Sequence, residues 1–512
     1  MIAMVRRASL VALSMLLATG VPVQAGGDSK AIRASARAAL PELVEFLALP
    51  NVATRSTAEI RKNAAWLEAR LKAHGWTARQ LPDGETPMVW GAYEKAGPKA
   101  PTILFYAHMD GQPVKNAEWT QADPFIPVLR ACRGTAPCTD VPLDRIAGDI
   151  DPDLRLFARS ASDDKGPIMM LVAAVDALRR EAREPAVNIR LIVDSHEEGG
   201  PNTLADVIRA NARDLAADSV VILDGPMHPS NRPTVVYGHR GGGVLRIVVY
   251  GPSHALHSGH FGNFVPNPAQ NLARLLASLK DAQGRVAIPG YYDGADPAFT
   301  TAIAKMGTPD DEAGLLHDAG VARAEGFVAS YRDAVSRPSL NLIGLDAGSG
   351  RALDRSIIPA DAAAAFDLRT VPGITFEAEL ARIRAFVTAQ GYHLVEGEPT
   401  AEERTENSLL ASVSGRPLSD ALFTDPRSAT GQWVRSALTD AFGVPPVEIA
   451  IMGGSVPSGP LARQLGAPLI LLPLVNADNN QHAANENLRL GNFLDGVKSL
   501  HALLSRRPST YR

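Results

Sequence analysis

The chain of 512 residues is poor in cysteine, aromatic residues and net charge: it has two cysteines, 5% aromatic residues and a formal net charge of −4. Two cysteines exclude a disulfide-rich scaffold, and the lack of a positive surplus argues against a nucleic-acid partner. A content of 46% hydrophobic and 21% charged residues excludes intrinsic disorder, a collagen-like chain and a polytopic membrane protein. A large globular enzyme with two or three packing units is the class that remains.

The first 25 residues are typical of a secretory signal peptide. A pair of arginines precedes an apolar stretch over residues 8–23, and Ala25 follows at a suitable cleavage position. An uncleaved membrane anchor is the alternative, but a glycine and a proline interrupt the short stretch. We therefore expect a signal peptide over residues 1–25, export to the periplasm or the medium, and no stable membrane anchor after cleavage.

Cys132 and Cys138 lie six residues apart in a segment rich in turn-forming residues. In an exported protein this pair favours a small disulfide loop, and a zinc pair is the competing interpretation. No second pair of Cys or His residues lies nearby in the sequence. We expect the two cysteines to staple a surface loop and to take no part in chemistry.

Short β-branched apolar runs alternate with helical patterns, which predicts an α/β fold with a mostly parallel sheet and helices on both faces. The runs cover residues 102–107, 187–193, 219–223 and 468–475. Ligands of open α/β sheets bind beyond the carboxyl ends of the strands. The residues that follow these runs are His108, Asp110, Glu197, Glu198, Asp224 and His482. Asp163 stands before a predicted helix over 168–180, which Asp163 or Asp164 could cap.

This set combines two imidazoles with several carboxylates and no thiol, which suits a divalent metal such as zinc, manganese or cobalt. Five ligands suffice for two ions when one carboxylate bridges them, a known hydrolytic arrangement. Because Glu197 and Glu198 are adjacent, one can bind metal while the other acts as a general base. Asp110, two residues after His108, can accept the other imidazole N–H.

The pattern changes from residue 238 onward. Alternating strands over 244–250 and 363–368 and helical spacing over 272–279 and from Thr375 suit a small α+β domain inserted into the catalytic one. We expect a catalytic domain over 26–237 and 401–512, interrupted by a domain over 238–400. Residues 281–335 are expected to form an additional, partly helical insertion.

Seven motifs follow one another along the chain. They are His108-Met-Asp-Gly-Gln-Pro, Trp119-Thr-Gln-Ala-Asp-Pro-Phe, Arg159-Ser-Ala-Ser-Asp-Asp-Lys-Gly, Glu197-Glu198-Gly, Leu256-His257-Ser-Gly, Gly453-Gly-Ser455-Val-Pro and His482-Ala-Ala-Asn-Glu486. Together they resemble the M20 family of dinuclear metallopeptidases, and most of all its carnosinase-like dipeptidases and glutamate carboxypeptidases. The resemblance runs from about residue 40 to the C-terminus, and it implies that the inserted domain is a lid and dimerisation domain.

The resemblance implies a role for each candidate residue of the metal centre. Asp163 would bridge two divalent ions, zinc first, with manganese or cobalt as alternatives. His108 and Asp224 would complete one ion, and Glu198 and His482 the other. Glu197 would be the general base, and Asp110 the carboxylate that orients an imidazole.

Further residues are implied to contact the substrate. His257 would cross the interface of a homodimer and stabilise the oxyanion, and Arg369 would clamp the substrate's carboxylate. The turn with Gly454 and Ser455 could present N–H groups to the same carboxylate, and Asn341 is implied as a further substrate-binding residue. An ordinary loop histidine, a solvated strand-end arginine and a simple turn are the alternatives. His196 replaces the family's acidic residue before the glutamate pair, and we interpret it as a loop residue rather than a substrate-facing one.

The sequence therefore predicts an exported dizinc exopeptidase that cleaves the amide bond of a dipeptide or small peptide with a free C-terminal carboxylate. The expected mechanism is attack by a metal-bridged hydroxide, with Glu197 as the general base. An N-acyl amino acid deacylase with the same centre is the nearest alternative. A non-catalytic binding relative of the fold is a third, against which the complete ligand set argues.

Overall fold

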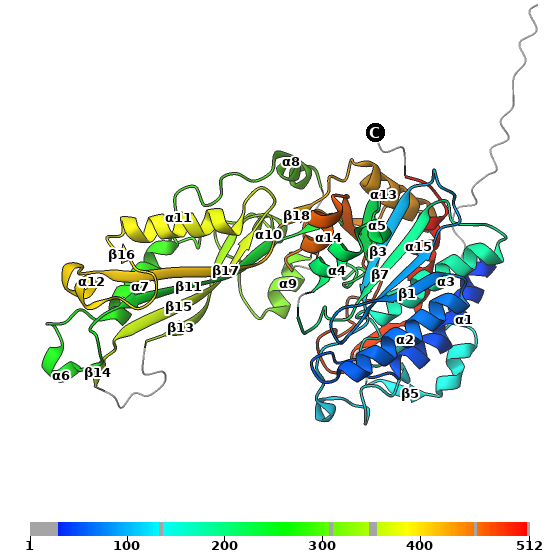
Figure 1. Ribbon diagram of the computed structural model, residues 1–512, viewed down its shortest axis with the longest axis horizontal. Helices are drawn as coiled ribbons and strands as arrows, with labels where there is room; N and C mark the ends of the chain where they lie inside the picture. Colours follow the sequence, from blue (N-terminus) through cyan, green and yellow to red (C-terminus); the bar gives the residue numbers. More distant parts are fainter. Residues whose placement is uncertain are drawn as a thin grey trace, which may run out of the picture.

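A computed structural model describes residues 29–132, 137–201, 203–306, 311–347, 356–454 and 458–508. The chain forms two sheet-containing units that lie side by side along the long axis of the molecule (Figure 1). The first unit contains an eight-stranded sheet and the second a five-stranded sheet. No helix within the described ranges is long and apolar enough to span a bilayer.

The sheet of the first unit has the strand order β1-β2-β7-β3-β8-β20-β9-β19. Its central pairs β7–β3, β3–β8 and β8–β20 are parallel, and the pairs β1–β2 and β2–β7 at one edge are antiparallel. The strands are β1 (Thr77–Leu81), β2 (Met88–Tyr93), β3 (Thr102–His108), β7 (Asn188–Asp194), β8 (Ser219–Ile222), β9 (Thr234–Val236), β19 (Val447–Ile449) and β20 (Leu469–Leu471). The four apolar runs of the sequence become β3, β7, β8 and β20, which confirms the predicted α/β class.

Strand β3 shows why both faces of this sheet carry helices. Successive side chains of a strand point to opposite faces. Ile103 and Phe105 enter one hydrophobic core, Leu104 and Tyr106 enter another, and all four are fully buried. The helices of the first core are α1 (Lys30–Leu47), α2 (Thr57–Ala73), α3 (Lys165–Arg180), α13 (Ala429–Phe442) and α15 (Leu490–Leu504), and those of the second are α4 (Leu204–Ala210), α5 (Ala212–Leu215) and α14 (Ser458–Leu465).

Helix α3 is buried along most of its length between α1 and α15, as an all-round apolar helix must be. It begins after Asp164, whose side chain makes no capping hydrogen bond. Asp164 therefore stands at the N-cap position, as the prediction allowed, but its side chain does not cap the helix. The reason is that both carboxylates have other partners: Asp163 Oδ1 contacts His108 Nε2 at 2.7 Å, and Asp164 Oδ2 accepts a long bond from His108 N at 3.4 Å.

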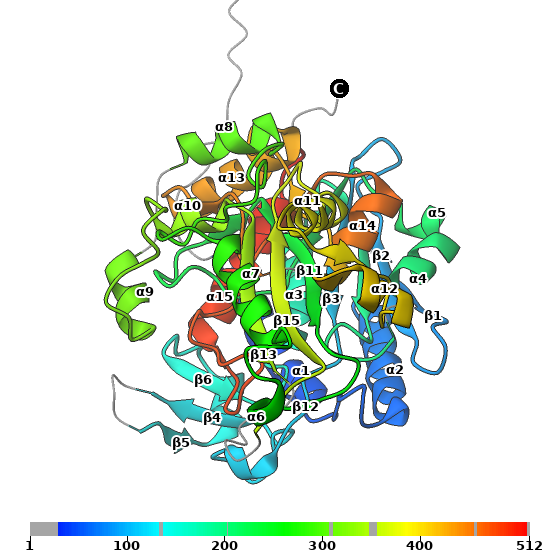
Figure 2. The same cartoon turned by 90° about the vertical axis from the view of Figure 1, so that its left-hand side faces the viewer.

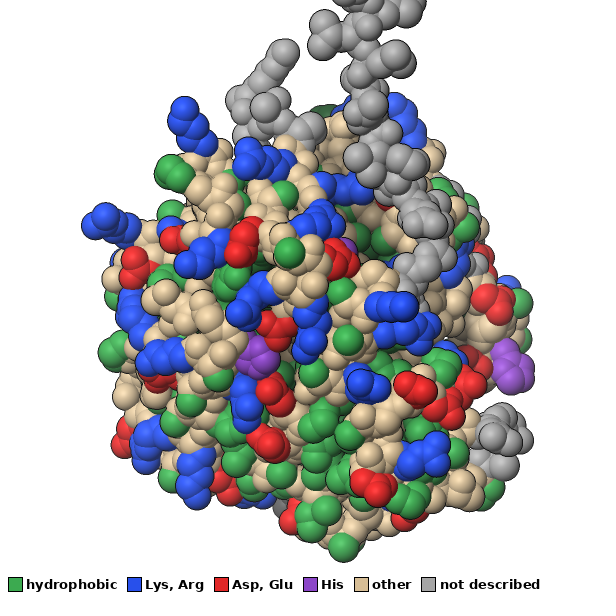
Figure 3. Space-filling model, turned by 90° about the vertical axis from the view of Figure 1, so that its right-hand side faces the viewer, with side chains coloured by type: hydrophobic (Ala, Val, Ile, Leu, Met, Phe, Trp, Pro, Cys, Tyr) green, Lys and Arg blue, Asp and Glu red, His purple; other side chains and the backbone are tan. Residues whose placement is uncertain are grey.

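A four-stranded antiparallel sheet of order β21-β6-β4-β5 flanks the first unit. Its strands are β4 (Val128–Ala131), β5 (Thr139–Val141), β6 (Leu154–Phe157) and β21 (Asn487–Arg489). Cys132 and Cys138 form a disulfide at the β4–β5 turn, so the predicted pairing is present. On the end of this unit that faces away from the second unit, basic, acidic and apolar side chains are interspersed (Figure 3).

The second unit has a sheet of order β13-β15-β11-β17-β16. The strands are β11 (Gly241–Tyr250), β13 (Ser339–Asp346), β15 (Asp361–Thr370), β16 (His393–Leu394) and β17 (Leu410–Ser419). Helices α7 (Pro268–Leu279) and α11 (Phe376–Ala389) cover one of its faces and share one apolar core with it. Figure 2 views this unit end-on.

The second unit extends beyond the predicted boundary at residue 400. Strand β17 pairs with β11 from Leu410↔Tyr250 to Ser419↔Gly242, so it belongs to the second sheet. The sequence signal was missing because the exposed half of β17 is polar and contains Pro417, which a strand tolerates at an edge. After β17, β18 (Leu422–Phe423) pairs with β10 (Gly238–His239) in a separate two-stranded sheet. The chain therefore returns from the second unit to the first near residue 420.

The segment 281–335 contributes three short helices, α8 (Pro297–Lys305), α9 (Glu312–Asp318) and α10 (Tyr331–Val335), as the predicted insertion requires. They lie where the two units meet (Figure 1). At the opposite end of the second unit, β12 (Leu256–His257) and β14 (Ile357–Ile358) pair beside α6 (Ser258–Phe261).

Candidate metal centre

Five predicted ligands lie together at the carboxyl edge of the large sheet. His108 ends β3, Asp224 follows β8, and Asp163 directly precedes the N-cap of α3. Ligand atoms of these three residues lie within 4.8 Å of one another, and so do those of Asp163, Glu198 and His482. The five side chains therefore form two groups of three that have Asp163 in common.

Asp163 lies between the two histidines. Its Oδ1 is 2.7 Å from His108 Nε2, and its Oδ2 is 3.1 Å from His482 Nε2, which is itself 3.4 Å from Glu198 Oε1. Oδ2 is buried and has no well-aligned hydrogen bond among the described residues. Burial acts to raise the pKa of Asp163, but the contacts with His108 and His482 lower it below its ordinary value. This carboxylate is therefore ionised, with one oxygen aimed into each group.

The residues present fit divalent cations. Burial first, and then neighbouring carboxylates, raise the pKa of Glu197 to about 8, that of Glu198 to about 7 and that of Asp224 to about 6. Such shifts express repulsion among negative charges in a dry site, which bound cations relieve. His108 and Asp163 are buried whereas the His482 side chain is 55% exposed, so the cluster is open on the His482 side.

Asp110 holds the loop that carries the glutamate pair. Its Oδ1 accepts the backbone N–H of Glu197 at 3.1 Å, and its Oδ2 accepts that of Glu198 at 2.9 Å. The nearest atom of Asp110 to His108 Nδ1 is its backbone oxygen, at 3.1 Å, and its carboxylate stands at 3.5 Å. Asp110 thus fixes the positions of Glu197 and Glu198 as directly as it orients the imidazole.

Glu486 is a functional residue to which the sequence reasoning gave no role. Its fully buried carboxylate accepts hydrogen bonds from Arg159 Nη1 at 2.7 Å and from the backbone N–H groups of Ser160, Ser162 and Asp163 at 2.9–3.0 Å. It therefore ties the loop of His482 to that of Asp163. The sequence did offer a signal. Arg159 stands four residues before Asp163 and Glu486 four residues after His482, so each motif carries one charged residue and the two charges are opposite.

Gln112 is a second such residue, because its Nε2 donates to Glu198 Oε2 at 2.6 Å and fixes that carboxylate. Its place in the first motif, four residues after His108, was the available signal.

His196 packs away from the metal cluster, as the loop interpretation requires. Its Nε2 is 2.6 Å from Thr86 Oγ1 and its Nδ1 is 3.3 Å from Asp83 Oδ2, both in the turn between β1 and β2. Gly200 has φ +124°, and a Cβ there would lie 2.5 Å from His196 Cδ2. The position of the His196 ring thus requires a residue without a side chain at position 200.

The predicted substrate-binding residues lie outside the cluster. Arg369, on β15, donates from Nε to Asp367 Oδ2 at 2.9 Å, and Asn341 is exposed on β13. His257 is the exposed N-cap of α6, at the end of the second unit far from β3 (Figure 1). The structure therefore does not bring His257 to the ligands of its own chain. Gly454 lies in the loop after β19, and Ser455 lies outside the described residues.

A histidine–carboxylate cluster at the carboxyl edge of an α/β sheet, beside an inserted second sheet, defines a metal-dependent enzyme of the α/β class. Residues 104–506 match the family described as peptidase family M20/M25/M40. The chain belongs to this family, and it is a metallopeptidase of the M20 type.

Curated relatives align over most of the chain. "Cys-Gly metallodipeptidase DUG1" of Candida albicans is 24% identical over 91% of this chain and 93% of its own length. "Beta-Ala-His dipeptidase" of Homo sapiens is 25% identical over 84% of this chain and 80% of its own length. An M20 family metallo-carboxypeptidase from Sulfolobus solfataricus has a similar structure, with a TM-score of 0.69, 25% identity, and coverage of 91% of this chain and 98% of that chain. Human carnosine dipeptidase 1 gives a TM-score of 0.66 at 21% identity, over 94% of this chain and 99% of that chain.

The comparisons correct the predicted export. The relatives matched over most of the chain are named as dipeptidases, and the matches bring no evidence for a signal peptide. The expectation was wrong because it rested on the composition of residues 1–25 alone, and a short basic and apolar start is a weak address signal. Those residues lie outside the described ranges.

Proposed function

We propose that the protein is a metal-dependent dipeptidase that hydrolyses an amide bond next to a free C-terminal carboxylate. The observation that carries the proposal is the pair of three-residue groups that share Asp163, with Glu197 adjacent to one ligand. The names of the relatives, Cys-Gly metallodipeptidase and Beta-Ala-His dipeptidase, support dipeptides as the substrate class.

In this proposal the cluster holds two divalent ions, zinc first, with manganese or cobalt as alternatives. His108, Asp163 and Asp224 would hold one ion, and Asp163, Glu198 and His482 the other. When bound, such ions polarise a carbonyl oxygen and lower the pKa of water. Ligands of nitrogen and oxygen with no thiolate suit all three metals.

Glu197 acts as the general base and general acid in the proposed reaction. It takes the proton from the attacking water and delivers it to the nitrogen of the leaving amine. The bond from its backbone N–H to Asp110 holds it beside the ligand Glu198 while it does so.

The second sheet unit and the loop after β19 supply the proposed contacts to the substrate. Arg369 offers the planar donor pair that a carboxylate matches, with Asn341, Gly454 and Ser455 as further contacts. His257 stabilises the oxyanion of a partner's active site, so the proposal includes a homodimer. The apolar side chains of Leu342, Ile343 and Leu345 on the outer strand β13 are 48–63% exposed, which supports an interface there.

The test is turnover of a dipeptide panel by zinc-loaded protein, with N-acyl amino acids included to detect a deacylase. The kcat of E197Q should fall by at least about a thousandfold, which lies in the upper part of the range for loss of a general base. Its zinc content should equal that of the wild type. E118Q, which neutralises an exposed glutamate paired with Lys115, is the matched control and should keep full activity. Full turnover by E197Q, or a wild type that hydrolyses no dipeptide, would overturn the proposal.

A further inference from the structure

A cavity of about 330 Å³ lies between the insertion and the second sheet, and residues of α9 and α10 line it. These two helices stand at the junction of the two units (Figure 1). One wall is apolar and is formed by side chains of the insertion: Leu315, Leu316, Phe327 and Val328. Arg240, Ser339 and Asn341 are among its polar lining residues. The cavity therefore combines an apolar surface with a buried positive charge.

Arg240 is the buried charge of this cavity, since its side chain is only 8% exposed. Nη2 donates to Arg337 O at 2.9 Å and to Ser339 Oγ at 2.6 Å, but Nε is buried without a partner. Within the described part of the chain no carboxylate forms an ion pair with it. A buried guanidinium with an unused donor is costly, and an anion supplied by a ligand would satisfy it.

Three contacts connect the cavity to the proposed carboxylate site. Ser339, which receives the Arg240 bond, is the cross-strand partner of Arg369. Arg240 N donates to Met452 O at 3.0 Å, directly before the Gly453–Gly454 turn. Val335, in the cavity wall, lies 3.9 Å from the position that a Cβ on Gly453 would take. The cavity thus adjoins both elements that are proposed to hold the substrate's C-terminus.

The rim of the cavity carries charges of both signs. Lys280, Glu312 and Glu325 line it, and Glu312 Oε1 accepts from the backbone of Tyr331 at 3.1 Å. The two glutamates repel a second negative charge on a ligand whose carboxylate is already held by arginine. An apolar side chain of the ligand is not repelled by these charges, and it would bury apolar surface against Leu315, Leu316 and Phe327.

We propose that this cavity receives the side chain of the substrate's C-terminal residue and selects an apolar one, with Arg240 as a second cation for the C-terminal carboxylate. The inference rests on the proposed function and adds to it a substrate class, dipeptides that end in an apolar residue. In this proposal Arg369, on β15, and Arg240, between β10 and β11, both contact the carboxylate, and the insertion supplies the pocket for the side chain.

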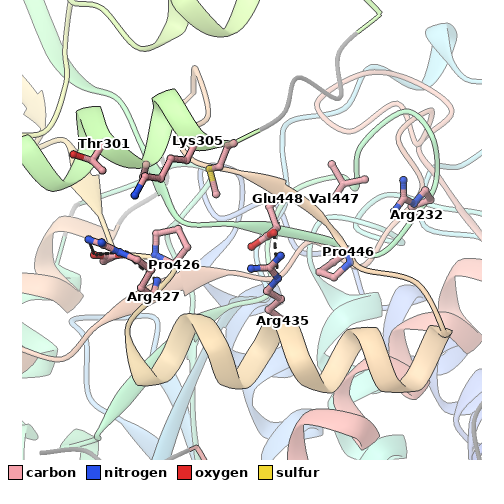
Figure 4. Close-up of a pocket in the computed structure, with 12 residues that line it drawn as sticks. Arg232, Thr301, Lys305, Pro426, Arg427, Arg435, Pro446, Val447 and Glu448 are labelled. Carbon is pink, nitrogen blue, oxygen red and sulfur yellow. Dashed lines mark hydrogen bonds and ion pairs between the residues drawn. The ribbon is translucent and has the colours of Figure 1, made fainter.

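A larger cavity of about 520 Å³, between α8, α13 and β19, does not offer a comparable site (Figure 4). Its carboxylates are already paired, Asp425 with Arg427 and Glu448 with Arg435. Its remaining cations, Arg232 and Lys305, are exposed to solvent. No charged side chain that lines it among the described residues is buried without a partner.

The first experiment compares kcat/KM for Ala-Leu, Ala-Gly and Ala-Glu. The wild type should prefer Ala-Leu over Ala-Gly by at least about tenfold, the value of a partly buried leucine side chain, and Ala-Glu should be the poorest substrate. L316S should reduce the Leu/Gly ratio to within about threefold of unity. L418S replaces an exposed leucine of β17 outside the cavity and is the matched control, with the ratio of the wild type.

The second experiment tests Arg240. R240M should raise KM for Ala-Leu by about tenfold or more with a smaller change in kcat, because a charged hydrogen bond to the bound carboxylate is lost. R240K keeps the charge, should fold if R240M does not, and should show part of the same rise in KM.

Equilibrium binding of the same dipeptides to zinc-loaded E197Q separates this inference from the proposed function. The pocket assignment is overturned, and the dipeptidase assignment stays, in either of two cases. In the first, the wild type hydrolyses dipeptides without preferring Ala-Leu; in the second, L316S lowers kcat/KM for Ala-Leu and Ala-Gly by the same factor. Binding that prefers Ala-Leu in a protein whose wild type hydrolyses no dipeptide supports the pocket and overturns the dipeptidase assignment. R240M and R240K with the KM of the wild type would show that Arg240 does not face the carboxylate.

Discussion

Replacing Glu486 by glutamine should damage both folding stability and metal binding, because one carboxylate serves both. In the wild type it accepts four N–H groups, from Arg159 and from the backbone of Ser160, Ser162 and Asp163. E486Q keeps the shape but puts an NH₂ group where the site offers donors only. The Arg159 side chain, 3% exposed, then keeps a buried charge without its counter-ion.

The expected loss of unfolding free energy is about 3–5 kcal/mol, the usual cost of removing one partner of a buried ion pair. That is a large share of the roughly 5–15 kcal/mol that stabilises a typical domain. Zinc affinity should fall about 10–100-fold, the typical effect of losing a group that orients a ligand. Urea unfolding followed by circular dichroism in the presence of chelator measures the first quantity, and competition with a fluorescent zinc chelator measures the second.

A double variant separates the two effects. R159M/E486L removes both charges, so it should recover much of the stability that E486Q loses. It cannot restore acceptors to the backbone N–H groups of Ser160, Ser162 and Asp163, so its zinc affinity should stay low. The reasoning is refuted if E486Q unfolds within about 0.5 kcal/mol of the wild type, or if the double variant regains wild-type zinc affinity.

Two further predictions concern histidines. The hydrogen bonds that the His74 ring donates to Asp176 and to Glu42 raise the pKa of His74 to about 9 from an ordinary value near 6.5. The charged form therefore contributes about 3 kcal/mol that is fully present below pH 6.5 and is lost as the pH rises to about 9. Urea unfolding at pH 6 and at pH 9.5 should show this loss in the wild type and a clearly smaller one in H74Q; equal losses would contradict the assignment. G200A should lower kcat for dipeptides, because its methyl group meets the His196 ring and φ at 200 is +124°. H196A/G200A should recover part of that activity, and a fully active G200A would contradict the contact.

The strand ends were the part of the fold that the sequence predicted best. A strand buried on both faces needs a continuous apolar run, so residues 102–107 could hardly form anything else, and the polar residue after the run must lie at the sheet's edge. His108 and Asp224 were placed by this reasoning without any knowledge of long-range contacts.

Strand β17 shows where this reasoning failed. Its second half, residues 414–418, is exposed and contains Pro417, so this part of the sequence has no apolar run to detect. β17 is a strand because nine residues of β11 pair with it in space. The boundary near residue 420 is for that reason a property of the packed sheet rather than of the local sequence.

The support of the site was hidden for a different reason. Arg159 and Glu486 are 327 residues apart, and neither spacing nor propensity reports a contact over that distance. Asp163 and Asp164 were expected to cap a helix because local rules favour acidic residues there. Asp163 instead joins the histidine–carboxylate cluster, and Asp164 accepts the backbone N–H of His108. A functional site is where local rules are expected to give way.

The position of β20 has a consequence for how the protein is made. This strand, Leu469–Leu471, pairs on one side with β8 and on the other with β9, both of which leave the ribosome more than 200 residues earlier. During synthesis the eight-stranded sheet therefore lacks its strand between β8 and β9 until β20 is made. The second sheet is complete by Ser419 and can already fold. The nascent chain carries His108, Asp163 and Glu198 long before His482 arrives, so an unfinished protein holds an incomplete set of ligands. In the proposed function, metal loading is thus coupled to completion of the chain, and a product that ends before His482 would lack one of the five proposed ligands.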